Sequence, residues 1–223
     1  MVFVKGGQFT MGSNDIDADP DEGDMKLVSI NDFYIGRYEV TQAEWNEIME
    51  ENLSVFQGKN HPVECVSWDD ANLFIKRLNE RTGRHYRLPT HEEWEYAAKG
   101  GQYANKCRYS GGNNLNEVGW MRNNSRETTH RVGLLKPNAL GLYDMTGNVH
   151  EWCDGLYDSL FYAQDTLMNK EYDLKDIRIF KGGCWGNPAK YCRISNINYH
   201  SRETKSFSIG FRLAEDVITN NNK

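Results

Sequence analysis

The chain lacks the patterns that would place it in a membrane, in a disulfide-held fold or on nucleic acid. It has no run of 18 apolar residues, and its first residues do not resemble a signal peptide, so no membrane span is expected. Its five cysteines are scattered and form no CxxC pair, which argues against a disulfide framework and a structural zinc site. The net charge of −6 disfavours broad nucleic-acid binding. The compartment stays open between the bacterial or phage cytoplasm and surface display.

A single domain is expected over residues 1–219, because alternating apolar residues run through most of the chain without a linker or an internal repeat. The tail at 220–223 is predicted to be disordered. Residues 178–212 hold seven Lys or Arg and one acidic residue, a net of +6, although the whole chain carries −6. This basic segment either forms a binding surface or pairs its charges with acidic neighbours in the same domain. The acidic run at 15–24 is expected to be a solvated loop, with a cation-binding loop as the alternative.

Three capping boxes predict the starts of three helices. The hydroxyl residues that begin them are Thr41, Ser67 and Thr90. The first helix should run to about Glu51, and glycines at 83 and 100–101 should end the other two. Strands are expected at 2–11 and 33–40, and after residue 101 turns and short strands dominate. The pattern is that of a loop-rich α+β domain.

Short motifs follow one another along nearly the whole chain. They are Gly6-Gly-Gln-Phe-Thr-Met-Gly-Ser13, Tyr38-Glu-Val-Thr-Gln42, Pro62-Val-Glu-Cys-Val-Ser-Trp68, Tyr86-Arg-Leu-Pro-Thr-His-Glu-Glu-Trp-Glu-Tyr-Ala-Ala98, Pro137-Asn-Ala-Leu-Gly-Leu-Tyr-Asp-Met-Thr-Gly-Asn-Val-His-Glu-Trp152, Lys181-Gly-Gly183 and Gly210-Phe-Arg212. In this order they resemble the formylglycine-generating enzyme (sulfatase-modifying factor) family. The resemblance implies a variant C-type-lectin fold: α+β, loop-rich, with a small antiparallel sheet and flanking helices.

In that family the loop corresponding to residues 144–151 binds a structural calcium ion. Carried over residue by residue, the resemblance implies ligands from the side chains of Asp144 and Glu151 and from the carbonyls of Gly147 and Val149. Calcium prefers about six to eight hard oxygen ligands, which an irregular loop can supply. The alternative is that the two acids cap turns or pair with arginine, with no ion bound.

The enzymes of the family oxidise a substrate cysteine to formylglycine with copper(I) held by two thiolates, and soft sulfur suits Cu(I). When this chain is aligned with the family at Lys181-Gly-Gly183, Cys192 falls at the second thiolate position. The first position holds Asn187, which is a poor Cu(I) ligand. Two further positions differ, since Cys184 replaces the family serine and His150 replaces a tryptophan. A displaced pair of Cys184 with Cys192 is the remaining route to a copper oxidase. Copper is therefore not expected. Whether the chain is an enzyme stays open, and a protein without catalytic activity is favoured.

Between the fixed landmarks, residues 178–213 carry side chains typical of a variable surface. The segment is rich in Asn, Tyr, His, Ser, Ile, Gly and Phe. These are the residues that an AAC asparagine codon encodes when its adenines are replaced. In this respect the chain resembles the variable proteins of diversity-generating retroelements, which share the fold and the closing Gly-Phe-Arg. Aromatic and small polar side chains also suit adaptable binding surfaces. The candidate ligand-binding residues are Cys184, Trp185, Asn187, Lys190, Tyr191, Ile197, Asn198, Tyr199, His200, Ser206 and Phe207.

The sequence therefore predicts a non-catalytic protein that binds a protein or a surface glycan through its C-terminal surface. The prediction requires Trp185, Tyr191, Tyr199, His200 and Phe207 to be exposed together on one face. Three alternatives remain: an ordinary family member whose segment has drifted, the copper-dependent oxidase, and a structural subunit of a larger assembly. The last would present a large apolar surface.

Overall fold

The fold is described from a computed structural model, for residues 1–19, 22, 25–156 and 176–217. The predicted tail at 220–223 and part of the acidic run lie outside the described residues. None of the described helices is long and apolar enough to cross a membrane. All five cysteines carry free thiols.

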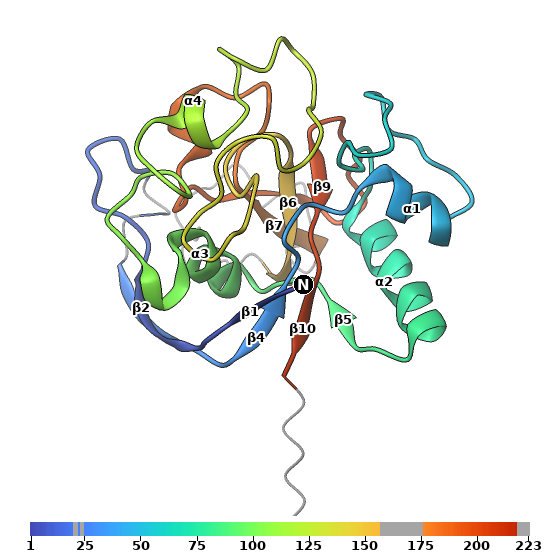
Figure 1. Cartoon of the computed structure of the whole chain (residues 1–223), viewed down its shortest axis with the longest axis horizontal. Helices are drawn as coiled ribbons and strands as arrows, with labels where there is room; N and C mark the ends of the chain where they lie inside the picture. Colours follow the sequence, from blue (N-terminus) through green and yellow to red (C-terminus); the bar gives the residue numbers. More distant parts are fainter. Residues whose placement is uncertain (20–21, 23–24, 157–175, 218–223) are drawn as a thin grey trace, which may run out of the picture.

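A four-stranded antiparallel sheet brings the two ends of the chain together. In spatial order its strands are β1 (Val2–Val4), β4 (Phe33–Ile35), β10 (Ala214–Asp216) and β5 (Tyr86–Arg87). β4 pairs with the first strand on one side and the last on the other, as Figure 1 shows. A separate antiparallel hairpin pairs β2 (Gly7–Met11) with β3 (Lys26–Ile30).

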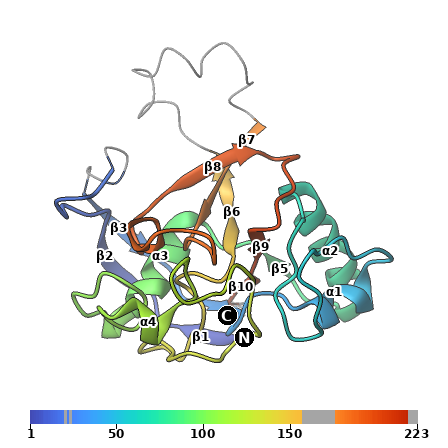
Figure 2. The same ribbon diagram turned by 90° about the horizontal axis from the view of Figure 1, so that it is seen from above.

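The second four-stranded sheet contains most of the candidate segment. Its order is β8 (Asn198–Ser201), β7 (Ile177–Lys181), β6 (His150–Leu156) and β9 (Ile209–Phe211). The β6–β9 pair is parallel and the other pairs are antiparallel, so the sheet is mixed at that edge. Figure 2 shows this sheet between the α1–α2 pair on one side and α3 with the β2–β3 hairpin on the other.

The three predicted helices are present, and each begins with a complete capping box. They are α1 (Gln42–Ile48), α2 (Trp68–Thr82) and α3 (His91–Lys99), and a short α4 follows at Leu115–Val118. Gly83 and Gly100 end α2 and α3 in the left-handed conformation that favours glycine. The local hydrogen bonds predicted for these helix ends are therefore confirmed.

α1 ends at Ile48, earlier than the expected limit at Glu51. Trp45 Nε1 donates to the Glu51 carbonyl at 2.7 Å, which holds the following turn outside the helix. Arg81 of α2 donates to the Glu47 carbonyl at 2.8 Å. A longer helix would have used that carbonyl for the amide of residue 51, so tertiary contacts decide where α1 stops.

β6 separates two parts of the hydrophobic core. Trp152 packs with α1, α2 and β9, whereas the next residue, Cys153, packs with α3, β1 and β4. Successive side chains of a strand point to opposite faces, so both faces of β6 are buried. The candidate segment is therefore tied to the centre of the domain through β7 and β9.

Candidate ligand-binding surface

The C-terminal segment begins as a buried strand and turns at two glycines. All five residues of β7 are buried, and Lys181 Nζ lies 2.9 Å from the buried carboxylate of Glu95. Gly182 and Gly183 follow with φ of 94° and 72°. A Cβ on Gly183 would lie 2.7 Å from Cys192 Sγ, so no side chain fits there. The turn fixes where the next residues leave the core.

A buried ion pair ties the segment to the acidic N-terminal loop. Arg193 Nη2 lies 2.6 Å from Glu22 Oε1, and Ser195 Oγ donates to the same carboxylate at 2.6 Å. Burial opposes ionisation of Glu22, but hydrogen bonds from Ser195, Asn196 and Arg193 hold its pKa below the usual value. The expectation of a solvated loop is wrong at Glu22, which is buried because it neutralises Arg193.

Arg212 closes the segment with a second buried pair. Its Nη2 lies 2.6 Å from Glu151 Oε1 and its Nε 2.5 Å from Oε2, and both side chains are fully buried. Nη1 donates to the Gly36 carbonyl at 3.0 Å, and Nη2 also donates to the Tyr143 carbonyl at 3.0 Å. The bidentate pair compensates the two buried charges, which water cannot reach to solvate.

The positive charge of residues 178–212 is used for internal pairing. Ion pairs with acidic residues are made by Lys181, Lys190, Arg193, Arg202, Lys205 and Arg212. The guanidinium of Arg178 lies 4.5 Å from the ring centroid of Trp68. Of the two interpretations of this basic segment, the structure supports pairing with acidic neighbours.

Trp185 and Phe207 form an aromatic group where β7 ends and β9 begins. Their ring centroids are 5.7 Å apart, and Trp185 Nε1 donates to the Phe207 carbonyl at 3.2 Å. Phe56, from the loop after α1, packs edge-on against Trp185 at 5.2 Å. Phe56 was not among the predicted residues, because no local pattern in the sequence places its loop beside residue 185.

The short helix η5 (Ala189–Cys192) presents one ring to solvent and buries one thiol. Tyr191 is 37% exposed, and Lys190 Nζ lies 4.7 Å from its ring centroid. Cys192, the next residue, is fully buried. Neighbouring positions of this turn therefore have opposite roles in the fold.

The edge strand β8 has one packed face and one open face. Tyr199 and the preceding Ile197 pack on Ile177 and Ile179 of β7. His200 is exposed, and its Nδ1 lies 2.7 Å from Thr204 Oγ1.

The candidate residues differ in exposure and are spread along the sheet. Tyr191, His200 and Phe207 are exposed, while Cys184 is buried. The half-buried candidates are Trp185, Asn187, Lys190, Ile197, Asn198, Tyr199 and Ser206. Trp185 follows the end of β7, whereas His200 pairs with Arg178 near its start. The expectation that Trp185, Tyr191, Tyr199, His200 and Phe207 are exposed together is therefore wrong for Trp185 and Tyr199, and the surface is elongated rather than a single compact patch.

At the copper site of the family this chain has a half-buried Asn187 and a buried Cys192, and Asn187 closes the turn after β7. Asn187 Oδ1 accepts from the Cys184 amide at 3.0 Å, and the Asn187 amide donates to the Cys184 carbonyl at 3.0 Å. Cys184 was expected among the ligand-binding residues, but it does not lie at the surface, because it is only 4% exposed. Burial raises the pKa of both Cys184 and Cys192, that of Cys192 to about 12.

His150 is buried in the same part of the core. Its ring packs edge-on against Phe180 at 4.9 Å, and burial lowers its pKa to about 4. Nδ1 has no hydrogen-bond partner among the described residues. Within that part of the chain, no group of three or more His, Cys, Asp or Glu is arranged to hold a metal ion.

The expected calcium ligands lie in a buried cluster of carboxylates. Both oxygens of Glu151 are bound by Arg212, and Oε2 also accepts from Trp94 Nε1 at 2.7 Å. One oxygen of Asp144 accepts from the Gly133 amide at 2.7 Å. The other, Oδ1, is buried without a partner among the described residues.

Glu39 adds a third carboxylate that was not predicted, although it lies in one of the family motifs. Its Oε1 accepts from the Val149 amide at 3.1 Å. Burial, with the nearby acids, raises the pKa of Glu39 well above its usual value and that of Asp144 to about 6. The set Asp144, Gly147, Val149 and Glu151 does not fit calcium in this arrangement, because Arg212 already neutralises Glu151. Calcium binding stays a prediction.

Comparison with known proteins places the chain in a family. Residues 1–217 match the family described as the sulfatase-modifying factor enzyme 1-like domain, and the chain belongs to that family. Chaperone protein LppX of Paenibacillus barcinonensis is 33% identical over 248 residues, which cover 87% of this chain and 81% of the relative. The formylglycine-generating enzyme of Thermomonospora curvata is 27% identical and covers 98% of this chain and 94% of its own length.

A solved structure agrees with the same assignment. Treponema denticola variable protein 1 superimposes with a TM-score of 0.85 at 27% identity, covering 97% of this chain and 95% of that one. The expected α+β fold class and the resemblance to a variable protein are therefore confirmed.

Proposed function

We propose that this chain is a non-catalytic ligand-binding protein on the formylglycine-generating enzyme scaffold. The exposed residues of its C-terminal segment are positions diversified by a retroelement, and they contact a protein or a surface glycan. The observation that carries the proposal is the contrast within residues 178–213. Lys181, Arg193 and Arg212 are buried and paired with distant acids, while Tyr191, His200 and Phe207 are exposed beside two charged residues, Glu203 and Lys205.

The outward residues suit a surface whose sequence varies. Tyr191, His200 and Phe207 are exposed, and their side chains support little of the core. Aromatic rings supply contact area at low entropic cost, and His, Ser and Asn supply adaptable hydrogen bonds. The similarity to Treponema denticola variable protein 1 supports this use of the scaffold.

The second candidate function is copper-dependent oxidation of a cysteine in a target protein. It is favoured by the relatives named formylglycine-generating enzymes. Cys184 and Cys192 would be the thiolate ligands. Asn187 argues against it, because a carboxamide stands at the first thiolate position and closes a turn there.

Diversification is tested by the DNA around the gene. The proposal expects a near-copy of the region encoding residues 184–212 that differs from it at adenines, beside a gene for a reverse transcriptase. A complete genome without such a copy would contradict diversification.

Catalysis is tested by Cu(I) titration of the reduced protein against a chelator of known affinity. The wild type should take up no stoichiometric copper, whereas Asn187→Cys, which restores the thiolate position, should bind it more tightly. Stoichiometric uptake by the wild type, with oxygen-dependent conversion of a cysteine peptide to formylglycine, would establish the oxidase instead.

A further inference from the structure

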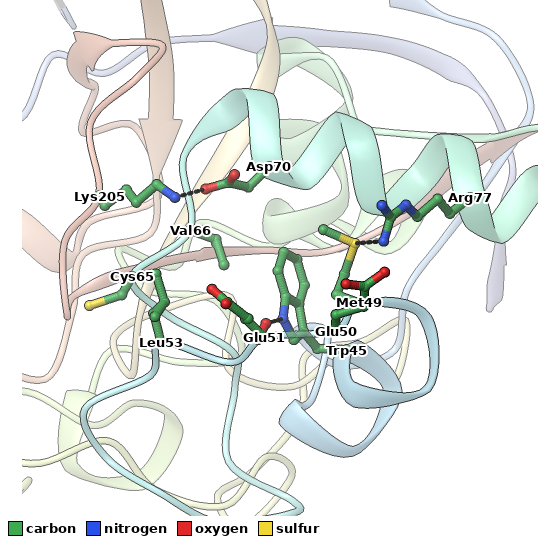
Figure 3. Close-up of a pocket in the computed structure, with 10 residues that line it drawn as sticks. All are labelled: Trp45, Met49, Glu50, Glu51, Leu53, Cys65, Val66, Asp70, Arg77 and Lys205. Atoms are coloured by element: carbon green, nitrogen blue, oxygen red, sulfur yellow. Dashed lines mark hydrogen bonds and ion pairs between the residues drawn. The ribbon is translucent and has the colours of Figure 1, made fainter.

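The loop of residues 52–58 lies beside the C-terminal segment but outside the part proposed to vary. At one end of the loop, Phe56 packs edge-on against Trp185 at 5.2 Å. At the other end, Leu53 lines a pocket of about 200 Å³ between α1, α2 and the loop before β9 (Figure 3). Phe207 belongs to the loop before β9 and packs on Trp185. A ligand on Phe207 would therefore reach the loop 52–58 as well.

Two buried side chains hold this loop in one conformation. Gln42 Nε2 donates to the Phe56 carbonyl at 2.8 Å, and Gln42 Oε1 accepts from the Gly58 amide at 3.1 Å. Glu64 Oε1 accepts from the Phe56 amide at 2.8 Å. Gln42 is 2% exposed and Glu64 is fully buried. The loop is therefore ordered before any ligand binds, which lowers the entropic cost of binding.

The polar side chains of the loop bond inward, and its aliphatic side chains face solvent. The Asn52 side chain donates to a buried glutamine oxygen at 3.4 Å, and Ser54 and Gln57 donate to backbone carbonyls. Leu53 is 57% exposed and Val55 is 58% exposed. The loop therefore presents mainly apolar area to a ligand.

The C-terminal side of this apolar group offers few free polar atoms. Trp185 Nε1 already donates to the Phe207 carbonyl at 3.2 Å. Ser206 Oγ lies 2.9 Å from Ser208 Oγ, so these two hydroxyls bond to each other. A glycan carries hydroxyl groups around each ring, and burying them here without partners would cost free energy. An apolar side chain needs no such partners.

Exposed charged residues of both signs border the apolar group. The acidic ones are Glu50, Glu51, Glu127 and Glu203, and the basic ones are Lys59, Arg122, Arg126 and Lys205. A ligand with a single charge would be repelled as well as attracted, so charge does not select the ligand. An apolar centre inside a polar rim is the usual anatomy of a contact between two proteins.

We propose that Leu53 and Val55 are a constant part of the ligand-binding surface. The ligand is a protein, which places an apolar side chain against these two residues and Phe207. The inference rests on the proposed function and narrows its partner from a protein or a glycan to a protein. The varying positions select the partner, and the loop supplies apolar contact area that every variant keeps.

The test is a library of the full chain under cell-surface display. It is sorted separately against lysozyme, as a protein probe, and against dextran, as a glycan probe. Lysozyme should yield binders and dextran should yield none. The randomised positions are Lys190, Tyr191, Asn198, His200, Ser206 and Phe207.

The lysozyme binders then receive matched changes inside and outside the loop. Leu53→Ser combined with Val55→Ser should weaken their affinity at least about tenfold, because the contact loses apolar area. Leu27→Ser changes a residue that is 70% exposed on the β2–β3 hairpin, across the sheet from α1 and α2 in Figure 2, and it should leave affinity unaltered. Neither change should lower the thermal midpoint, because all three residues are exposed.

Two results would overturn the inference alone. They are equal effects of the loop change and of Leu27→Ser on affinity, and dextran binders as frequent as lysozyme binders. A library without binders to either probe would contradict the proposed function itself, so the two failures are distinguishable.

Discussion

Two kinds of residue alternate within the C-terminal segment, and the fold depends on them to different degrees. Arg193 is 1% exposed and lies in an ion pair, whereas Tyr191, two positions earlier, is 37% exposed. Arg212 is fully buried, whereas Phe207 is 49% exposed. Proximity in the sequence therefore says little about how much each side chain stabilises the domain.

The difference comes from where each residue finds its partners. The buried cations pair with acids from distant parts of the chain: Lys181 with Glu95, Arg193 with Glu22, and Arg212 with Glu151. The exposed side chains are positioned mainly by their own backbone: Tyr191 lies on η5, His200 on β8, and Phe207 in the loop before β9. The first group should tolerate little change and the second group much.

The largest effect is expected for Arg212→Met. This change leaves the carboxylate of Glu151 buried without its cation, which should cost about 3–5 kcal/mol of the free energy of unfolding. Arg202→Met breaks a half-exposed pair with Asp69 and should cost about 1 kcal/mol or less. Urea unfolding of both variants checks this, and equal losses would remove the distinction between the two kinds of residue.

A glycine pair tests the turn that supports the surface. Gly83 and Gly183 have similar φ, 67° and 72°, but a Cβ meets nothing at Gly83 and clashes with Cys192 at Gly183. Gly83→Ala should cost about 1 kcal/mol from backbone strain alone. Gly183→Ala should cost clearly more, as measured by urea unfolding. If the two variants lost the same stability, the turn would not constrain the segment.

The buried part of the molecule should also respond to acid. Burial lowers the pKa of His91 to about 4, so between about pH 4 and 6.5 the unfolded chain binds a proton there that the folded chain does not. This contribution to stability is present above pH 6.5 and is lost as the pH falls towards 4. His91→Gln should reduce the slope of unfolding free energy against pH by up to about 1.4 kcal/mol per unit in this window.

The control for that experiment is His85→Gln, which changes an exposed histidine and should leave the slope unaltered. An unchanged slope in His91→Gln would show that the histidine is not kept neutral by the fold.

The smallest effects are expected at the surface. Tyr191→Ser, His200→Asn and Phe207→Ala should each change the free energy of unfolding by about 0.5 kcal/mol or less. Thermal unfolding measures this directly. A loss above about 2 kcal/mol at any of these positions would assign it to the framework instead.

Local hydrogen bonding is the part of the fold that the sequence predicts well. The capping boxes at Thr41, Ser67 and Thr90 need only residues three positions apart, and all three form. The end of α1 was misplaced because it depends on Arg81, which lies on another helix. Family motifs predicted the overall fold, since their order carries information that no single helix signal has.

The candidate site was harder to predict because its contacts join distant segments. Phe56 reaches Trp185 across the fold, and Glu22 leaves the acidic loop to neutralise Arg193. Cys184 follows a glycine pair that suggests an open turn, yet its side chain points into the core. These outcomes depend on which way a side chain points, and a single sequence does not contain that information.

The central claim is that the exposed positions of the C-terminal segment can change while the fold stays fixed. The most direct measurement is thermal unfolding of the triple variant Tyr191→Asn, His200→Asn and Phe207→Ser. The account predicts a cooperative transition whose midpoint falls by less than about 6 °C, because the three sites are exposed and their small effects add. Loss of the cooperative transition would show that these residues hold the fold together, which would contradict a surface built to vary.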